Sequence, residues 1–434
     1  MVVKHGIVIS LDENDRIFND GAIVIQDGRI LEVNKTSMIE KKYKADEVID
    51  ARGKVVLPGL INTHMHSESI RGIGDDLPLY EWLESYVHPE HKATRPEDAY
   101  AMSRLGYCES IKSGTTCLLD MHRFMDRCAD AAEKIGIRAV LAPYVSDQIN
   151  FLEKFEDNKK LIKKRHGSCN GRIMVWCGLH HWRDCSPELL KKARECADKY
   201  GVGIHTHTNE SIRDVELAKK RYGKKPIEHL HEFGITGPDV VLAHCVWLSK
   251  KEIKILEETK TRVAHCPVAN MKLADGIAPI PTFLSRGIGV GLGTDGSKEC
   301  NSFDMFEVMK FTALLHTVNQ LDTTVMPSGK VLRMATRGGA QALGLEKELG
   351  SLEKGKRADL IVVNLTKLHL TPILYEPFNV ISHLVYAARG SDVETVIVDG
   401  KVVMENRIIK NVDESEVIRT ATERSKKLLE RIQR

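Results

Sequence analysis

Histidines at spacings that suit metal binding are the most distinctive feature of this 434-residue chain, which contains 18 of them. His64 and His66 stand two residues apart in an apolar stretch that begins at Leu60. In an extended strand, residues i and i+2 point to the same side about 6–7 Å apart, so both imidazoles can reach one ion. A single H-x-H motif is a weak indication, because a histidine on an apolar strand is often a hydrogen-bonded core residue.

Polar residues of the same kind stand near the ends of four further apolar stretches. These residues are His205, His207, His244, His265 and Asp295. Imidazole and carboxylate ligands, without thiolates, suit Zn²⁺ or Fe²⁺ with one position left open for water. Each histidine alone has a structural explanation, but the whole set together predicts a metal site.

The elements that must position these residues repeat the order of an apolar strand and then a helix. Eight strand–helix units over residues 58–344 predict an α/β fold, a (β/α)8 TIM-like barrel, more readily than an open doubly wound sheet. Because the carboxyl ends of all eight strands meet at one face of a barrel, we expect the histidines and Asp295 to lie together there. The candidate strands are Leu60–His66, Thr115–His122, Arg138–Tyr144, Ile173–His181, Val202–Asn209, Val240–Val246, Thr261–Cys266 and Ile288–Thr294.

Both ends of the chain have a different pattern, with short strands separated by turn signals. Residues 1–57 contain three such strands, and the pattern returns within residues 345–434, at Ala358–Val363 and Val393–Val403. We therefore expect one small β-sandwich domain formed by both termini, with the catalytic barrel inserted between its two parts. The charged, helically spaced stretch Glu414–Ile432 predicts a C-terminal amphipathic helix packed on the body.

Composition places the chain among soluble globular proteins, with 42% hydrophobic and 28% charged residues. The 63 basic and 60 acidic residues give a net charge of +3, which offers no footprint for nucleic acid or an anionic membrane. The sequence begins without a signal-peptide pattern, and no stretch approaches the roughly 18 apolar residues of a membrane span. Ten scattered cysteines without a C-x-x-C pair are expected to be buried thiols. We expect a cytoplasmic protein whose partner is a small molecule.

Five motifs resemble those of the amidohydrolase superfamily and occur in that superfamily's order. They are Leu57-Pro-Gly-Leu-Ile-Asn-Thr-His64-Met-His66-Ser67, His207-x-x-Glu210, Leu242-Ala-His244-Cys245, the run from His265 to Leu273, and Gly293-Thr-Asp295-Gly-Ser297. The details are similar to the branch that contains methylthioadenosine/S-adenosylhomocysteine deaminases and triazine hydrolases. The likeness covers almost the whole chain, including the segment from Gly350 to Leu360.

The resemblance implies one divalent metal ion per chain, with Zn²⁺ favoured and Fe²⁺ as the alternative. Relatives with two metals need a carboxylated lysine near the end of strand four, and the segment Met174–Trp182 contains no lysine. The ligands that the resemblance implies are His64, His66, His207 and Asp295.

The resemblance also implies catalytic roles for Glu210, His244 and Asp295. Hydrolytic deamination adds water to a ring carbon and expels ammonia, and a bound divalent metal lowers the pKa of that water. Asp295 can take the remaining proton, Glu210 can protonate the neighbouring ring nitrogen, and His244 can orient the hydroxide. The alternative for Glu210 is a first-turn acid favoured by the dipole of a helix over residues 211–222.

Three further residues are candidates for substrate binding, each with a structural alternative. Trp82 resembles a family position near the ring-binding pocket but would also suit the core of an amphipathic helix. His180 matches a histidine that faces substrate in relatives, and His265 either does the same or braces the rim of the barrel. Seven other histidines are expected to be structural or at the surface: His88, His91, His122, His181, His229, His231 and His316.

The leading hypothesis is a metal-dependent aminohydrolase that deaminates an amino-substituted nitrogen heterocycle. The expected substrate is an adenosine derivative such as methylthioadenosine or S-adenosylhomocysteine, or another aminated purine, pyrimidine or pterin. The chain departs from the family in substrate-facing loops, at residues 181–184, Trp247, Ala269 and residues 298–300. The alternatives are a triazine-type hydrolase that displaces chloride or an amine, and a non-catalytic barrel scaffold. A homodimer is expected from the family alone.

Overall fold

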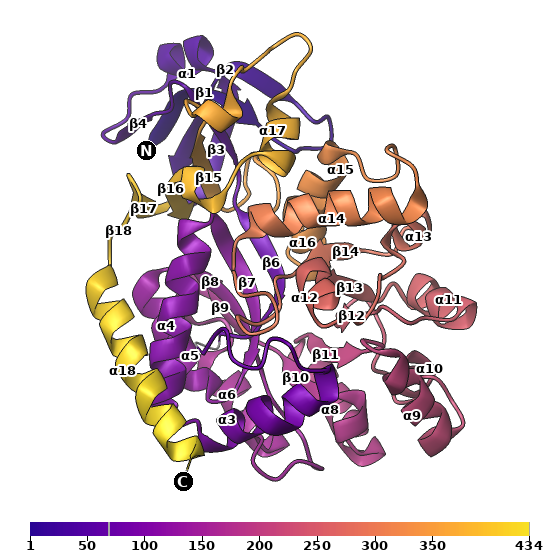
Figure 1. Ribbon diagram of the computed structural model, residues 1–434. Coiled ribbons are helices and arrows are strands. Elements are labelled where there is room, and N and C mark those ends of the chain that lie inside the picture. The colour runs from indigo at the N-terminus through magenta and orange to yellow at the C-terminus, as the bar shows by residue number, and fades with distance from the viewer. Residues whose placement is uncertain (68–69, 434) are drawn as a thin grey trace.

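The strands of the computed structural model form three sheets, two of them parallel (Figure 1). The structure describes residues 1–67 and 70–433. One parallel sheet has the strand order β6-β7-β8-β9, and the other has the order β10-β11-β12-β13-β14. These strands are β6 Leu60–Met65, β7 Thr115–His122, β8 Arg138–Pro143, β9 Ile173–Val175, β10 Cys177–His181, β11 Ile204–Thr208, β12 Val240–His244, β13 Arg262–His265 and β14 Val290–Leu292.

The parallel strands lie where the sequence predicts eight of them, with one interruption. The stretch Ile173–His181 is divided at Trp176 into β9 and β10. Trp176 N donates to Leu141 O of β8 at 2.9 Å, and Cys177 N donates to Gly203 O beside β11 at 2.9 Å. The predicted fourth strand therefore bridges the two parallel sheets.

Helices connect the successive parallel strands. Helix α8 begins and ends where capping residues predict, because Ser186 Oγ accepts from Leu189 N at 3.2 Å and Gly201 ends the helix with a φ of +63°. The longer helices are α4 Pro96–Lys112, α5 Met125–Ile135, α6 Phe155–Arg165, α8 Pro187–Tyr200, α9 Ile212–Tyr222, α11 Lys250–Thr259 and α14 Met305–Gln320. Shorter helices and single turns are α1 Thr36–Lys42, α2 Leu79–Trp82, η1 Leu83–Val87, α3 His88–Ala93, α7 Ser168–Gly171, η2 Trp182–Asp184, α10 Pro226–Glu232, α12 Pro267–Lys272, α13 Ile280–Ser285, α15 Ser328–Arg333, η3 Met334–Gly338, α16 Gly339–Ala342, η4 Leu368–Leu370, α17 Val380–Tyr386 and η5 Gly390–Asp392.

The third sheet unites strands from both ends of the chain. Its order is β18-β17-β16-β15-β5-β1-β2-β3, with β4 paired beside β1. Antiparallel pairing of β5 with β15 sets Val56 opposite Val362, so the two ends of the sequence share one hydrogen-bonded sheet. The two-layered sandwich form stays a prediction. The strands are β1 Val2–Ile9, β2 Ile17–Gln26, β3 Arg29–Lys35, β4 Val48–Asp50, β5 Lys54–Pro58, β15 Leu360–Asn364, β16 Val393–Val398, β17 Lys401–Glu405 and β18 Ile408–Ile409.

Two ion pairs tie the carboxyl-terminal part of the chain to the region of the parallel strands, one to strand β8 and one to helix α4. Arg138 on β8 forms a bidentate pair with Asp359, with Nε–Oδ2 and Nη2–Oδ1 distances of 2.9 and 3.1 Å, and both side chains are buried. The last helix, α18 Glu414–Ile432, runs beside α4 (Figure 1), where Arg424 Nε donates to Asp98 Oδ1 at 2.8 Å. This helix has the bounds that the sequence predicts.

No helix among residues 1–67 and 70–433 is long and apolar enough to cross a membrane. All ten cysteines are free, and apart from the half-buried Cys169 they are buried, in agreement with the sequence prediction. Burial raises the pKa of Cys117 to about 12, so this thiol stays protonated at neutral pH.

Candidate active site

The predicted metal ligands converge at the carboxyl ends of β6, β11 and β14. His66 Nε2 lies 3.2 Å from Asp295 Oδ1 and 3.2 Å from His207 Nε2. His64 Nε2 lies 3.3 Å from the same oxygen of Asp295. All four side chains are buried, and Asp295 N donates to His64 O at 3.0 Å, which holds the end of the last parallel strand against the end of the first.

Hydrogen bonds on the far side of the imidazole rings turn their Nε2 atoms toward one point. The Nδ1 atoms of His66 and His207 contact the carbonyl oxygens of Met121, at 2.7 Å, and of His180. Since a carbonyl oxygen only accepts, these Nδ1 atoms carry protons and the Nε2 atoms present lone pairs. Burial lowers the pKa of His64 to about 4 and the pKa of His207 well below its ordinary value, which keeps both rings neutral.

This crowding of acceptor atoms fits a divalent cation. Two Nε2 lone pairs 3.2 Å apart, with a carboxylate oxygen equally close, repel one another unless a positive ion lies between them. Zinc–nitrogen bonds of about 2.0–2.1 Å in a tetrahedron place ligand atoms about 3.3–3.4 Å apart, close to the observed separations. The residues that would hold the metal are His64, His66, His207 and Asp295.

Glu210 lies just beyond β11, beside the predicted ligands. Asn209 precedes it with a φ of +52°, a left-handed conformation that turns the chain out of the strand. Glu210 Oε1 is 3.6 Å from His244 Nε2. Burial, together with the charges of Asp214 and Asp295, raises the pKa of Glu210 to about 8. At neutral pH this group is therefore a carboxylic acid that can donate a proton.

His244 ends β12 and faces two carboxyl groups. Its Nε2 lies 3.6 Å from Glu210 Oε1 and 3.8 Å from Asp295 Oδ2. Asn270 Nδ2 lies 3.1 Å from the Nδ1 of His244, and because an amide nitrogen only donates, His244 carries its proton on Nε2. Asn270 thus orients His244 as a hydrogen-bond donor toward Glu210 and Asp295.

Left-handed backbone recurs at the ends of the parallel strands. Asn209, His244 and Asp295 have φ values of +52°, +69° and +68°. For residues other than glycine, such conformations cost about 1–3 kcal/mol each and cluster where a fold must aim a side chain. Here they direct Glu210, His244 and Asp295 toward a common centre.

A small cavity of about 50 Å³ lies over the metal ligands. Trp82 and His180, two of the three predicted substrate-binding residues, line it. The third, His265, is not among the described residues that line it. Instead, His265 Nε2 contacts His316 Nε2 of α14 at 3.1 Å, which is the geometry of the bracing alternative.

Some residues at the cavity were given no role from the sequence. Tyr144 Oη contacts the Nδ1 of His66 at 2.9 Å, and its ring packs edge-on against His180 with 4.9 Å between centroids. Tyr144 ends a predicted strand, so the strand-end signal that identified the histidines also applies to it. His181, expected to be structural, and Arg183 line the cavity as well. The signal for Arg183 is that residues 181–184 depart from the family pattern.

Of the H-x-H pair on β11, only one histidine faces the centre. His205 Nε2 lies 2.8 Å from the Nδ1 of His64, and its own Nδ1 contacts Val241 O at 2.9 Å. His205 therefore orients a ligand from behind. His91, which was expected to be structural or at the surface, lines the cavity.

Residues 55–403 match the Amidohydrolase family. The chain belongs to this family. The matched region begins in β5 and ends in β17, so it contains every residue of the metal cluster, and the resemblance inferred from the motifs is confirmed.

Among other amidohydrolases, the chain is 43% identical over 437 aligned positions to 5′-deoxyadenosine deaminase of Methanosarcina acetivorans, covering 99% of both chains. It is 42% identical over 426 positions to 5-methylthioadenosine/S-adenosylhomocysteine deaminase of Syntrophomonas wolfei, covering 97% of both. The structure of atrazine chlorohydrolase TrzN from Arthrobacter aurescens TC1, complexed with zinc, superposes with a TM-score of 0.89 at 25% identity. That match covers 98% of this chain and 99% of the chlorohydrolase.

Proposed function

We propose that this amidohydrolase is a hydrolytic deaminase of an amino-substituted nitrogen heterocycle, with an adenosine derivative as the substrate class. The observation that carries the proposal is the position of the half-buried Glu210 carboxyl group, whose Oε1 lies 3.6 Å from His244 Nε2 beside the proposed metal ligands. A deaminase must protonate a ring nitrogen while water adds to the neighbouring carbon, and a carboxyl group that keeps its proton at neutral pH suits that step. The likeness to relatives named as deaminases of 5′-deoxyadenosine and of 5-methylthioadenosine/S-adenosylhomocysteine supports the same class.

The nitrogen and oxygen ligand set supports one divalent cation, for which we favour Zn²⁺ over Fe²⁺. When bound, such an ion supplies a water molecule whose pKa is lowered toward neutrality. The zinc in the similar chlorohydrolase structure supports the choice of metal. Elemental analysis of the freshly purified protein tests it directly.

The residues of the chain would carry the protons. Asp295 accepts a proton from the attacking water, and Glu210 donates its proton to the ring nitrogen beside the attacked carbon. His244 Nε2–H donates a hydrogen bond to the oxygen that becomes attached to this carbon. The proton on Asp295 then passes to the amine, which leaves as ammonia, and Glu210 regains a proton from the new hydroxyl as the carbonyl forms.

Trp82 and His180 are the proposed contacts to the heterocycle, because both line the cavity over the metal ligands. The hydrogen bond of His265 to His316 supports a bracing role over the substrate contact that the resemblance suggested. The rest of the ring-binding surface would come from Leu79 and Leu83, which line the same cavity.

The domain division is also a proposal. Residues 58–344 would form a closed (β/α)8 barrel between the two parts of a β-sandwich, residues 1–57 and residues 345–434, the latter with the C-terminal helix. The backbone bond between Asp295 and His64 and the bridging stretch at Trp176 support closure. We further propose that the protein acts on a small heterocyclic substrate, that it is cytoplasmic and that it forms a homodimer.

Product analysis distinguishes the proposed deaminase from its rivals. We expect the metal-loaded protein to release ammonia from 5′-deoxyadenosine or a related adenosine derivative. Chloride release from atrazine without ammonia release from any adenosine derivative would favour the triazine-type hydrolase instead. Neither product, in a protein that binds no metal, would point to the non-catalytic scaffold.

A further inference from the structure

A helical segment covers the active site. This covering segment consists of α2, η1 and α3, residues 79–93, and its side chains Leu79, Trp82, Leu83 and Val87 line the cavity over the metal ligands. The cavity holds about 50 Å³, whereas one water molecule occupies about 30 Å³ and ligand pockets about 300–1,000 Å³. A purine nucleoside does not fit beneath the segment as it stands, so the segment must move to admit the substrate.

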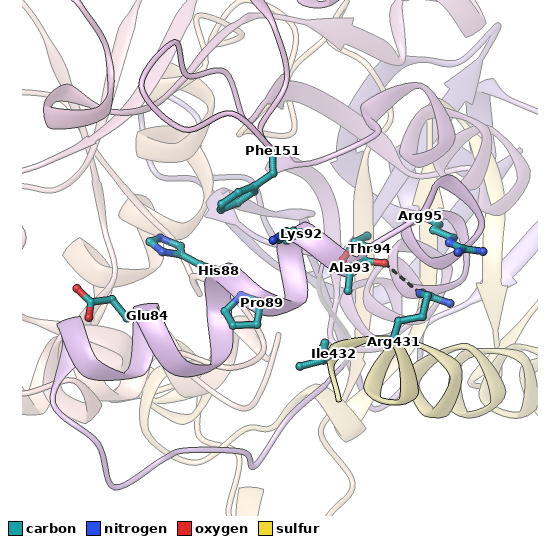
Figure 2. A pocket seen from close by; sticks show the side chains of 10 residues that line it. All are labelled: Glu84, His88, Pro89, Lys92, Ala93, Thr94, Arg95, Phe151, Arg431 and Ile432. Atoms are coloured by element: carbon teal, nitrogen blue, oxygen red, sulfur yellow. Dashed lines mark hydrogen bonds between the residues drawn. The ribbon is translucent and has the colours of Figure 1, made fainter. Parts of the chain in front are cut away.

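The outer side of the covering segment faces open space. Figure 2 shows Glu84, His88 and Lys92 on this side, bordering a cavity of about 790 Å³ that Phe151 and the end of α18 also line. The segment therefore has free volume beside it, while its end is tied to α18, where Arg431 Nε donates to Ala93 O at 3.1 Å.

A buried carboxylate holds the start of the covering segment, while an ion pair between Glu90 Oε2 and Lys298 Nζ at 2.9 Å holds its end. Tyr80 Oη, on α2, donates to Asp214 Oδ1 at 2.9 Å, and Arg183 Nη1 donates to the same oxygen at 3.1 Å. Arg183 Nη1 also lies 3.2 Å from Tyr80 Oη. Burial raises the pKa of Tyr80 to about 12, so its hydroxyl keeps the proton that it donates.

The other oxygen of this carboxylate holds the loop that carries Glu210. Asp214 Oδ2 accepts from Ser211 N at 3.1 Å, and Asp214 N donates to Ser211 Oγ at 3.3 Å, forming a capping box at the start of α9. Ser211 directly follows Glu210 in the chain. A single side chain therefore spans the covering segment and the loop of the proposed proton donor.

We propose that Tyr80, Arg183 and Asp214 are positioning residues that couple closure of the covering segment to the placement of Glu210. When the segment lifts, Tyr80 leaves Asp214 and the start of α9 loses one of its fixed contacts. When it closes over substrate, the same bond sets Glu210 in place and the heterocycle is shut off from solvent. The inference rests on the proposed role of Glu210 in deamination.

A double-mutant cycle on Tyr80→Phe and Asp214→Ala measures the coupling. Each single variant should lower kcat/KM for 5′-deoxyadenosine by about tenfold or more, the factor that corresponds to one hydrogen bond to a charged group. Because both variants remove the same bond, the double variant should be no worse than the worse single variant. If the fold-loss of kcat/KM in the double variant equalled the product of the two single losses, the proposal would be overturned.

Hydrogen exchange gives a readout that does not depend on catalysis. In Tyr80→Phe, we expect the amides of residues 79–93 and of residues 210–215 to exchange about tenfold faster together, while the sheet from both chain ends is unchanged. Tyr86→Phe is the matched control, since Tyr86 lies in the same segment and its side chain is exposed. Faster exchange in residues 79–93 alone, or in neither region, would overturn the coupling. If the protein deaminated nothing, this measurement would still decide whether the two regions move together.

Discussion

Strands β6 and β15 are both largely buried, but the side chains that they bury are of different kinds. Every residue of β6 is buried, including Asn62, Thr63 and His64, whereas the buried residues of β15 are all aliphatic. Each polar side chain of β6 has a specific partner: Asn62 Nδ2 donates to Thr294 Oγ1 at 2.8 Å, and Thr63 Oγ1 donates to Leu292 O at 2.9 Å. The parallel strands therefore keep buried polar groups in fixed directions, while the sheet from both chain ends gains its stability from apolar burial.

This difference predicts how the two regions respond to substitution. At the ends of the parallel strands, we expect the loss of a side chain to abolish metal binding or catalytic activity. In the sheet that joins the chain ends, we expect the loss of a side chain to lower the free energy of unfolding and to leave the catalytic activity unchanged.

The largest effect is expected from His66→Ala, which removes one of the four proposed metal ligands. The variant should lose its metal and its deamination activity while keeping its fold, as measured by elemental analysis, ammonia release and circular dichroism. His231→Ala is the control, because that exposed side chain contacts only Thr236 Oγ1, at 2.8 Å, among the interactions described for it. Full metal content in His66→Ala would remove His66 from the ligand set.

The next largest effect is expected from Glu210→Gln. Removing the proposed proton donor should lower deamination by at least about 100-fold, the usual scale of general acid–base catalysis, with metal content unchanged. Glu216→Gln, an exposed change on α9, should match the wild type. Normal turnover in Glu210→Gln would rule out its role as proton shuttle.

The pH dependence of kcat/KM tests whether Glu210 acts in its protonated form. Because Glu210 acts in its protonated form and its pKa is raised to about 8, kcat/KM should fall about tenfold per pH unit above that value. Below it the group stays protonated, so this carboxyl imposes no loss there. The residual activity of Glu210→Gln should lack this alkaline limb, and a limb that persisted in the variant would belong to another group.

The smallest effect on activity is expected from Ile397→Ala in β16. Its buried side chain lies opposite Leu360 and belongs to the same apolar cluster as Val56, in the core of the sheet from both chain ends. Leaving a cavity there should lower the free energy of unfolding by about 2–5 kcal/mol, measured by denaturant titration, with kcat unchanged at 25 °C. A large loss of kcat in the folded, metal-loaded variant would show that the two regions are not independent.

The sequence allowed the elements to be predicted from local patterns, and the strand-end histidines with Asp295 to be recognised as a candidate metal site, for which the family resemblance then implied the four ligands. Apolar runs mark the parallel strands, and the bounds of β7 and α18 agree with the prediction residue for residue. His207 and Asp295 were identified because each stands where a predicted strand ends. In the structure, His207 Nε2 and Asp295 Oδ1 each lie 3.2 Å from His66 Nε2.

Contacts between distant segments could not be predicted in this way. The periodicity of β11 treats His205 and His207 alike, and only the packing of β6 against β11 sets one ring behind the other. The bond from Tyr80 to Asp214 joins residues 134 positions apart, and nothing in the spacing of either motif indicates it. Such pairs depend on how whole elements dock, which single-sequence patterns do not encode.

The pairing of β5 with β15 has a consequence for how the chain is made. On the ribosome, β5 emerges about 300 residues before its partner, an interval of about 15–60 s at ordinary rates of translation. Throughout that time the edge formed by Val55, Val56 and Leu57 presents unpaired backbone groups and bare aliphatic side chains. The amino-terminal part therefore carries an unpaired sheet edge, a feature that favours aggregation, until synthesis is nearly complete.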